Sequence, residues 1–125
     1  MNLLIVEDDT MLRNWLSMLL NSLTGYQLQI HEACDGLEAL EICEIDLVIT
    51  DIKMPRMDGL QLIQCLQERY PRIRTAVLSS YDDFSFVKIA LQYGSLDYIL
   101  KAEMTVKDLS QLLDKVQNDF RVEHS

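Results

Sequence analysis

The 125 residues of the chain, 49% hydrophobic and 25% charged, are typical of one globular domain with one core. A net charge of −9 argues against direct binding to nucleic acid, because phosphate contacts need clustered lysine and arginine. No apolar run approaches the roughly 20 residues of a membrane span and no signal peptide is visible, so we expect a cytoplasmic protein without membrane contact.

Five short runs have the pattern of β-strands. Most are apolar throughout, as expected for strands that are buried on both faces of a parallel sheet. The second run alternates apolar and polar residues, as a half-exposed strand would. In chain order, the runs are Asn2–Val6, Gln27–Ala33, Asp46–Thr50, Ile73–Leu78 and Leu96–Leu100.

Each predicted strand is followed by a segment whose apolar residues recur every three or four positions, which predicts a helix. Asp9 or Thr10 can cap the first helix, and Asp58 can cap the third. Pro71 ends the third helix. In chain order, the segments are Thr10–Leu23, Leu37–Cys43, Leu60–Tyr70, Asp82–Tyr93 and Thr105–Phe120.

This strict alternation of strands and helices predicts an α/β fold. We expect a doubly wound, five-stranded parallel sheet with five helices that cover both faces. The expected strand order is the flavodoxin-like 2-1-3-4-5, in which the first and third strands are neighbours. We place the domain at residues 1–121 and expect a frayed polar tail at residues 122–125.

Charged side chains directly follow three of the predicted strands. Glu7 and Asp8 follow the first strand, Asp51 follows the third, and Lys101 follows the fifth. The C-terminal ends of parallel strands share one edge of the sheet, and ligands bind there. Carboxylates and phosphate oxygens are the ligands that Mg²⁺ prefers. The sequence therefore predicts a site for a divalent cation and a phosphoryl group.

Each charged group has a possible chemical role at this edge. The carboxylate of Asp51, after the central strand, can act as a nucleophile toward a phosphoryl group. Glu7 and Asp8 can hold a cation that offsets the charge of that group. Lys101 can pair with Asp51 and then with a phosphoryl oxygen. Each residue also has an ordinary structural alternative, as a helix cap or a solvated charge.

Two serines, Ser79 and Ser80, end the fourth strand, and either hydroxyl could donate a hydrogen bond to a phosphoryl group. The cysteines Cys34, Cys43 and Cys65 have no CxxC spacing and are predicted to be reduced thiols. The two histidines, His31 and His124, lie far apart in the sequence, and together with the cysteine spacing they argue against a zinc site.

The chain resembles the receiver domain of two-component response regulators. The stretch from Asp51 through Leu60 is the most specific part of the likeness. The matching segments have the order and spacing of that family and cover nearly the whole chain. They are Val6–Asp9, Thr50–Leu60, Leu78–Tyr81 and Asp97–Lys101.

The resemblance implies a set of roles around a bound Mg²⁺. Asp51 would be the phosphoacceptor and a metal ligand. Asp8 would bind Mg²⁺ directly, Glu7 mainly through a water molecule, and Lys53 through its backbone carbonyl. The donor would be a phosphohistidine on a sensor histidine kinase. The domain would modify its own aspartate and would not be a turnover enzyme.

The resemblance also implies a switch. Ser79 is similar to the switch hydroxyl of the family, Lys101 to its site lysine and Tyr98 to its aromatic switch residue. The face formed by the fourth helix, fifth strand and fifth helix would contact an output domain or partner, or form a homodimer on phosphorylation. Candidate members of this face are Phe84, Lys88, Tyr98 and Lys107.

Two features bear on the output and on the loop after Lys101. Tyr81–Phe84 and Asp97–Tyr98 resemble receivers that are attached to DNA-binding helix-turn-helix domains, which implies a role in transcription regulation. Ala102 stands where the family usually has a proline after a cis peptide bond. Because a non-proline cis bond costs roughly 3 kcal/mol, we expect a trans bond between Lys101 and Ala102.

Three other functions share some of these features. A degenerate receiver would bind partners without phosphorylation. A phosphatase of the haloacid dehalogenase type would need a second acid two positions after the nucleophile, where this chain has Lys53. An electron carrier of the flavodoxin type shares the fold but would need a phosphate-binding Ser/Thr/Gly loop after the first strand, where this chain has three acids.

Overall fold

A computed structural model of the chain describes residues 1–42 and 44–123. Cys43, expected in the second helix as a reduced thiol, lies outside the described residues. Residues 124–125 of the expected tail also lie outside them. Helix α5 reaches Glu123, so it passes residue 121, and the domain end at that residue stays a prediction.

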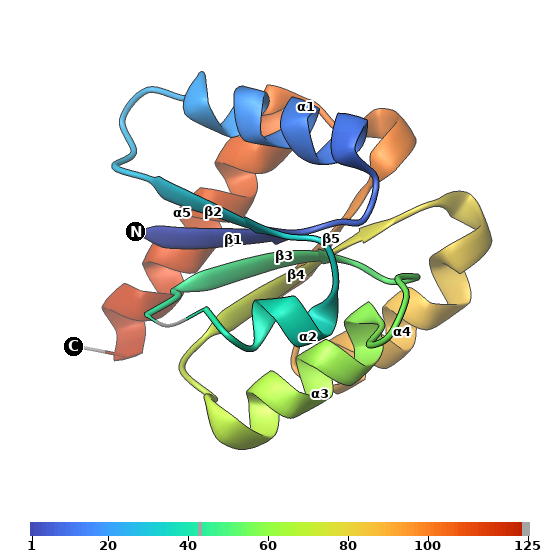
Figure 1. Ribbon diagram of the computed structural model, residues 1–125. Coiled ribbons are helices and arrows are strands. Elements are labelled where there is room, and N and C mark those ends of the chain that lie inside the picture. The colour runs from blue at the N-terminus through green and yellow to red at the C-terminus, as the bar shows by residue number, and fades with distance from the viewer. Residues whose placement is uncertain (43, 124–125) are drawn as a thin grey trace.

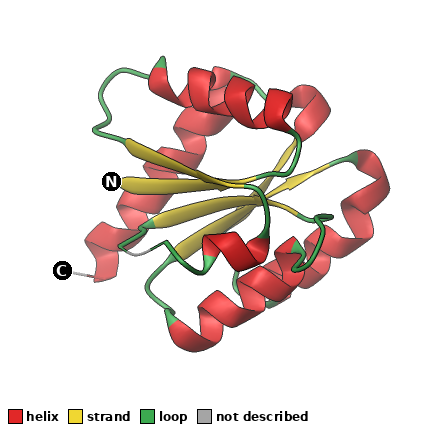
Figure 2. Cartoon of the chain, in the orientation of Figure 1, coloured by secondary structure: helices red, strands yellow, loops and turns green. Residues whose placement is uncertain are grey.

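The core of the fold is a five-stranded parallel sheet, and the predicted strand order is confirmed as β2-β1-β3-β4-β5 (Figures 1 and 2). The strand ends differ from the sequence-based bounds by no more than two residues. The strands are β1 (Asn2–Val6), β2 (Gln29–Ala33), β3 (Leu47–Asp51), β4 (Arg74–Ser79) and β5 (Asp97–Leu100).

Five α-helices cover the two faces of this sheet, as predicted (Figure 1). Helices α1 and α5 pack on one face, and α2, α3 and α4 pack on the other. Two short 3₁₀ turns, η1 (Tyr81–Asp83) and η2 (Lys101–Glu103), follow β4 and β5. The helices are α1 (Thr10–Asn21), α2 (Gly36–Ala39), α3 (Gly59–Arg69), α4 (Phe84–Gln92) and α5 (Val106–Glu123).

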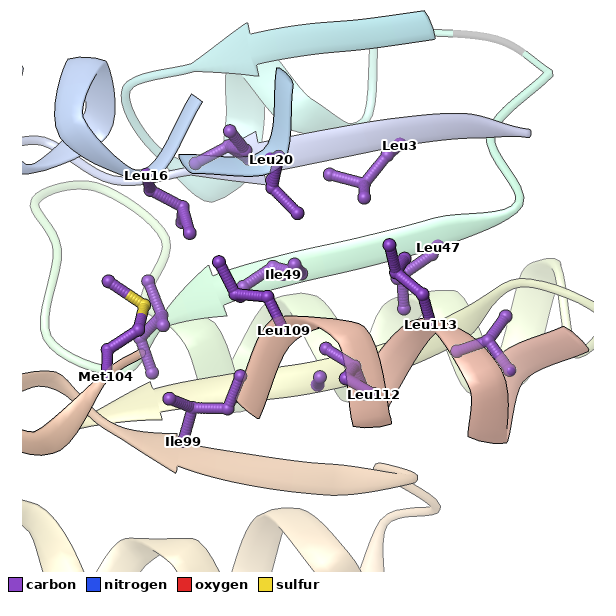
Figure 3. Close-up of a cluster of buried hydrophobic side chains, with 14 residues drawn as sticks. Leu3, Leu16, Leu20, Leu47, Ile49, Ile99, Met104, Leu109, Leu112 and Leu113 are labelled. Carbon is purple, nitrogen blue, oxygen red and sulfur yellow. The ribbon is translucent and has the colours of Figure 1, made fainter. Parts of the chain in front are cut away.

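The largest hydrophobic cluster lies between the sheet and helices α1 and α5 (Figure 3). Leu3 and Leu47 of the sheet, Leu16 of α1 and Leu113 of α5 all belong to this cluster, and all four are fully buried. Burial of a leucine side chain contributes roughly 1.5–3 kcal/mol. This packing anchors β1 and β3, the two strands that lead to the charged residues, against α1 and α5.

Side-chain caps set the start of two helices. Asp9 Oδ1 accepts hydrogen bonds from the backbone N–H groups of Met11 and Leu12, so Asp9 acts as the expected cap of α1. Asp58 and Gln61 form a reciprocal capping box at the start of α3. This capping box fixes the point at which the loop after β3 ends and α3 begins.

Helix α2 is shorter than predicted. The apolar residues Leu37 and Leu40 suggested a helix as far as position 43, but α2 has only the single turn Gly36–Ala39. Ile45 instead reaches the core from an irregular segment and is buried there.

Two apolar residues within the predicted helical segments lie outside the core. Leu91 of α4 is 42% exposed, and Tyr70, the last residue of the predicted third helix, is 52% exposed. Tyr70 is the C-cap of α3, where the chain has already left the helical path. The described chain contains no cis peptide bond, so the Lys101–Ala102 bond is trans, as expected.

Candidate functional site

Three carboxyl groups meet at the C-terminal edge of the sheet. Residues Val6 and Thr50 are paired in register, so the residues that follow them, Glu7 and Asp51, leave neighbouring strands side by side. One carboxylate oxygen from each of Glu7, Asp8 and Asp51 lies within 4.8 Å of the other two. Glu7 and Asp51 are buried, whereas Asp8 is exposed to solvent. The site is therefore buried at Glu7 and Asp51 and open to solvent at Asp8.

Lys101 is the cation that faces this cluster. Its Nζ lies 2.9 Å from Asp51 Oδ2 and 3.4 Å from Glu7 Oε1. Burial alone lowers the pKa of Lys101, but its contacts with Asp51 and Glu7 raise that pKa overall. The other oxygen of Asp51, Oδ1, accepts a hydrogen bond of 2.8 Å from the backbone N–H of Ile52. The Asp51 carboxylate is thus held from two sides.

Glu7 shows that the cluster has unbalanced negative charge. Its side chain is 1% exposed, and its Oε2 atom has no hydrogen-bond partner among the described residues. Burial and, next, the nearby Asp51 carboxylate together raise the pKa of the Glu7 carboxyl to about 8, although Lys101 lowers it in part. A divalent cation would remove this repulsion and satisfy the free oxygen. The donor set, all hard oxygen atoms, fits Mg²⁺.

The structure separates the two serines after β4. Ser79 is fully buried, and its Oγ has no hydrogen-bond partner among the described residues. Ser80 Oγ lies 2.9 Å from Asp83 Oδ2 and donates to it. Only the hydroxyl of Ser79 therefore remains available for a new acceptor, which favours Ser79 over Ser80 as a phosphoryl contact.

Asp83 is a buried acid beside the site that the sequence reasoning missed. Its Oδ1 lies 3.2 Å from Lys53 Nζ, and its Oδ2 accepts from Ser80. Burial raises the pKa of Asp83, but the contacts with Ser80 and Lys53 lower it overall. The spacing of Ser80 and Asp83 fits a capping box, which is a signal that could have identified this residue.

Tyr98 lies on β5 and faces solvent rather than the site. Tyr98 is 36% exposed, and its ring packs edge to face against Phe84 of α4, with 5.9 Å between the ring centroids. Lys88 of α4 and Lys107 of α5 are also exposed. The four predicted members of this surface are thus accessible together on the elements α4, β5 and α5.

The comparison with known protein families agrees with the arrangement of these residues. Residues 3–117 match the model of the response regulator receiver domain. The chain belongs to the response regulator receiver family. Similar proteins of known sequence and structure support this assignment.

Two curated relatives of this receiver domain are regulators of greater length. The chain is 33% identical over 126 residues to the positive alginate biosynthesis regulatory protein of Pseudomonas aeruginosa, covering 98% of this chain and 50% of that protein. It is 36% identical over 100 residues to the transcriptional regulatory protein HptR of Staphylococcus aureus, covering 78% and 39%. The chain spans half or less of the length of such relatives.

A solved structure supports the receiver fold over nearly the whole chain. The receiver domain of AraT, a response regulator from Geobacillus stearothermophilus, superimposes with a TM-score of 0.84 at 29% identity. The match covers 99% of this chain and 98% of that domain. The receiver family also excludes the phosphatase and electron-carrier alternatives, which share only parts of the site or the fold.

Proposed function

We propose that this receiver domain accepts a phosphoryl group on Asp51 from a sensor histidine kinase. The observation that supports this role most strongly is the contact of 2.9 Å between Lys101 Nζ and Asp51 Oδ2, beside the carboxyl groups of Glu7 and Asp8. Asp51 has a shorter contact with the ammonium than Glu7 does, and it is the last residue of the central strand β3.

In the proposed reaction, an oxygen of Asp51 attacks the phosphorus of a phosphohistidine. A new O–P bond forms, the P–N bond breaks, and the histidine nitrogen keeps the electron pair and takes up a proton. Lys101 then shares its charge between Asp51 and the phosphoryl oxygens. The product is an aspartyl phosphate on the protein itself, so the domain does not turn over a substrate.

Mg²⁺ fits the cluster as the cofactor of this reaction. Asp8, Asp51 and the backbone carbonyl of Lys53 would hold it, and Glu7 would act mainly through a water molecule. When bound, Mg²⁺ offsets the negative charge that accumulates as the phosphoryl group approaches. Without the cation, the Asp8 carboxylate places further negative charge beside the nucleophile, which would repel the incoming group.

Phosphorylation would change the surface around Tyr98. The buried Ser79 hydroxyl, which has no other partner in the described chain, would move to donate to a phosphoryl oxygen. Tyr98 would then leave its contact with Phe84 and turn inward. The surface of α4, β5 and α5 would thereby change, as a two-state shift biased by one local hydrogen bond.

This surface would control an output domain, a partner protein or a homodimer, and the output would concern transcription. The two regulators described above are longer than this chain, which leaves room for an output domain.

We place the function in the cytoplasm. None of the helices among the described residues is long and apolar enough to cross a membrane. The acidic receiver itself would not bind DNA.

The direct test is incubation with acetyl phosphate and Mg²⁺, followed by intact-mass measurement. The wild-type protein should gain one phosphoryl group, and Asp51→Asn should gain none. If the variant gains the group at the wild-type rate, another residue is the acceptor. If neither protein gains the group under any Mg²⁺ concentration, the chain is a degenerate receiver that binds partners without phosphorylation.

The proposed switch has a separate test. Amide chemical shifts are recorded with and without beryllofluoride, which mimics a phosphoryl group on an aspartate. We expect shift changes at α4 and β5, including Phe84 and Tyr98, as well as around Asp51. Changes restricted to the immediate neighbours of Asp51 would contradict the proposed surface.

A further inference from the structure

The loop from β3 to α3 connects the proposed phosphoacceptor to a helix, and its two ends are held tightly. At the first end, Asp51 Oδ1 accepts from Ile52 N–H at 2.8 Å. At the second, Gly59 N–H donates to Ile52 O at 2.7 Å. A Cβ at position 59 would lie 2.0 Å from the carbonyl oxygen of Asp51, so the ends can approach only because residue 59 is glycine.

The middle of this loop is not held by hydrogen bonds between backbone groups. Between Lys53 and Arg56, the described structure contains no backbone hydrogen bond. Arg56 has a φ of 65°, in the left-handed region that residues with a Cβ rarely adopt. A strained conformation of this kind persists only where surrounding contacts hold it.

Arg56 has such contacts with Asp35, which precedes α2. Arg56 Nε and Nη2 lie 2.7 Å and 2.6 Å from Asp35 Oδ2. The Asp35 side chain is 4% exposed, and its Oδ1 accepts from the backbone N–H of Glu38 at 2.9 Å. Asp35 is therefore fixed as the N-cap of α2, and it offers Arg56 a rigid, desolvated acceptor.

A second contact joins the same two segments. Gly36 N–H donates to Met57 O at 3.2 Å, and a Cβ at position 36 would lie 2.7 Å from Met57 Cγ. The start of α2 thus touches the β3–α3 loop through both backbone and side chains. Together, the Arg56–Asp35 and Gly36–Met57 contacts join the start of α2 to the β3–α3 loop, which directly follows the proposed phosphoacceptor Asp51.

We propose that Arg56 and Asp35 form a positioning clamp that fixes the β3–α3 loop and, with it, the backbone carbonyl of Lys53. The clamp rests on the proposed function, in which this carbonyl is a ligand of Mg²⁺. In this proposal, neither Arg56 nor Asp35 would contact the metal or the phosphoryl group. Groups that orient the ligands of a metal change its affinity by about 10- to 100-fold when they are removed.

The test is the Mg²⁺ dissociation constant, measured by isothermal titration calorimetry on folded, metal-free protein. Arg56→Gly removes the pair and also relieves the backbone strain. Asp35→Asn weakens the pair but leaves a residue that still caps α2. Arg56→Lys keeps the charge but loses the planar fork. Arg72→Gly is the control, because Arg72 is an exposed arginine at the opposite end of the sheet, before β4.

We expect Arg56→Gly and Asp35→Asn each to raise the Mg²⁺ dissociation constant about tenfold. The double variant should bind no more weakly than either single variant, because both remove one interaction. Arg56→Lys should restore part of the affinity, and Arg72→Gly should bind as the wild type does. Amide shifts of Lys53 and Met57 should change in the two clamp variants and stay unchanged in the control.

The sign of the effect separates the clamp from simple electrostatics. Loss of the Arg56 charge alone would favour a cation and tighten Mg²⁺ binding, whereas loss of the Asp35 charge alone would weaken it, so the sign is decisive for Arg56→Gly. Wild-type or tighter binding by either Arg56→Gly or Asp35→Asn would overturn the clamp, while normal phosphorylation of wild-type Asp51 would leave the proposed function intact. If the wild-type protein binds no Mg²⁺, both proposals fail. Asp35→Asn and Arg56→Lys keep the test decisive if Arg56→Gly does not fold.

Discussion

Removal of the Lys101 charge should destabilise the metal-free protein, because Lys101 is the cation that lies between two buried acids. At an effective dielectric constant of about 20, the separations of 2.9 Å to Asp51 and 3.4 Å to Glu7 correspond to about 6 and 5 kcal/mol of gross attraction. Breaking a buried pair by removal of one partner costs roughly 3–5 kcal/mol.

We expect Lys101→Met to lie at the lower end of that range, a loss of about 3 kcal/mol. The raised pKa of the Glu7 carboxyl, about 8, reduces its negative charge at pH 7, so the contact with Asp51 contributes the larger share. The Lys101 side chain is also 24% exposed, which lets water compensate part of the loss.

The assay is urea denaturation at pH 7 with a chelator present. The control is Lys115→Met, because Lys115 is 51% exposed and lies 3.5 Å from Asp97, a surface pair worth about 1 kcal/mol or less. The double variant Lys101→Met with Asp51→Asn should recover part of the lost stability, since the uncompensated carboxylate is gone. Equal losses for Lys101→Met and Lys115→Met would refute the reasoning about the buried charges.

Three further predictions follow from the same structure. A hundredfold excess of Mg²⁺ over its dissociation constant should stabilise the wild type by about 2.7 kcal/mol, seen as a higher melting temperature, and Asp8→Ala should lose this response. Gly59→Ala should cost about 3 kcal/mol or more in denaturant unfolding, because its Cβ would lie 2.0 Å from the Asp51 carbonyl oxygen; a loss under about 1 kcal/mol would contradict this contact. The Glu38 N–H and the Arg56 guanidinium lower the pKa of Asp35, so its contribution to stability is present above the unfolded-state pKa and is lost as the pH falls through the lower folded-state value. Asp35→Asn should therefore flatten the acid limb of a plot of stability against pH, and an unchanged acid limb would contradict that pair.

The sheet and the acidic cluster were predictable because their signals are local. An apolar run that ends in Asp51 specifies a buried strand and the edge at which the carboxylate emerges. The strand order then brings Glu7 beside it without any information on side-chain contacts. The same reasoning placed Lys101 opposite these acids, where the structure has it.

The remaining features depend on contacts that no local pattern encodes. The early end of α2 reflects the burial of Ile45 from an irregular segment, and the apolar spacing of Leu37 and Leu40 cannot show this. The choice between Ser79 and Ser80 depends on the capture of one hydroxyl by Asp83. Likewise, the Arg56–Asp35 pair joins residues 21 positions apart through a left-handed backbone conformation.

The position of the phosphoryl group after reaction with acetyl phosphate tests the central claim most directly. Borohydride reduction converts an aspartyl phosphate into homoserine, and peptide mass mapping then identifies the modified residue. We predict one modified residue, Asp51, formed with Mg²⁺ and absent with a chelator. Modification of a different residue, or equal modification of Asp51 in the presence of the chelator, would contradict a Mg²⁺-dependent phosphoacceptor at the end of β3.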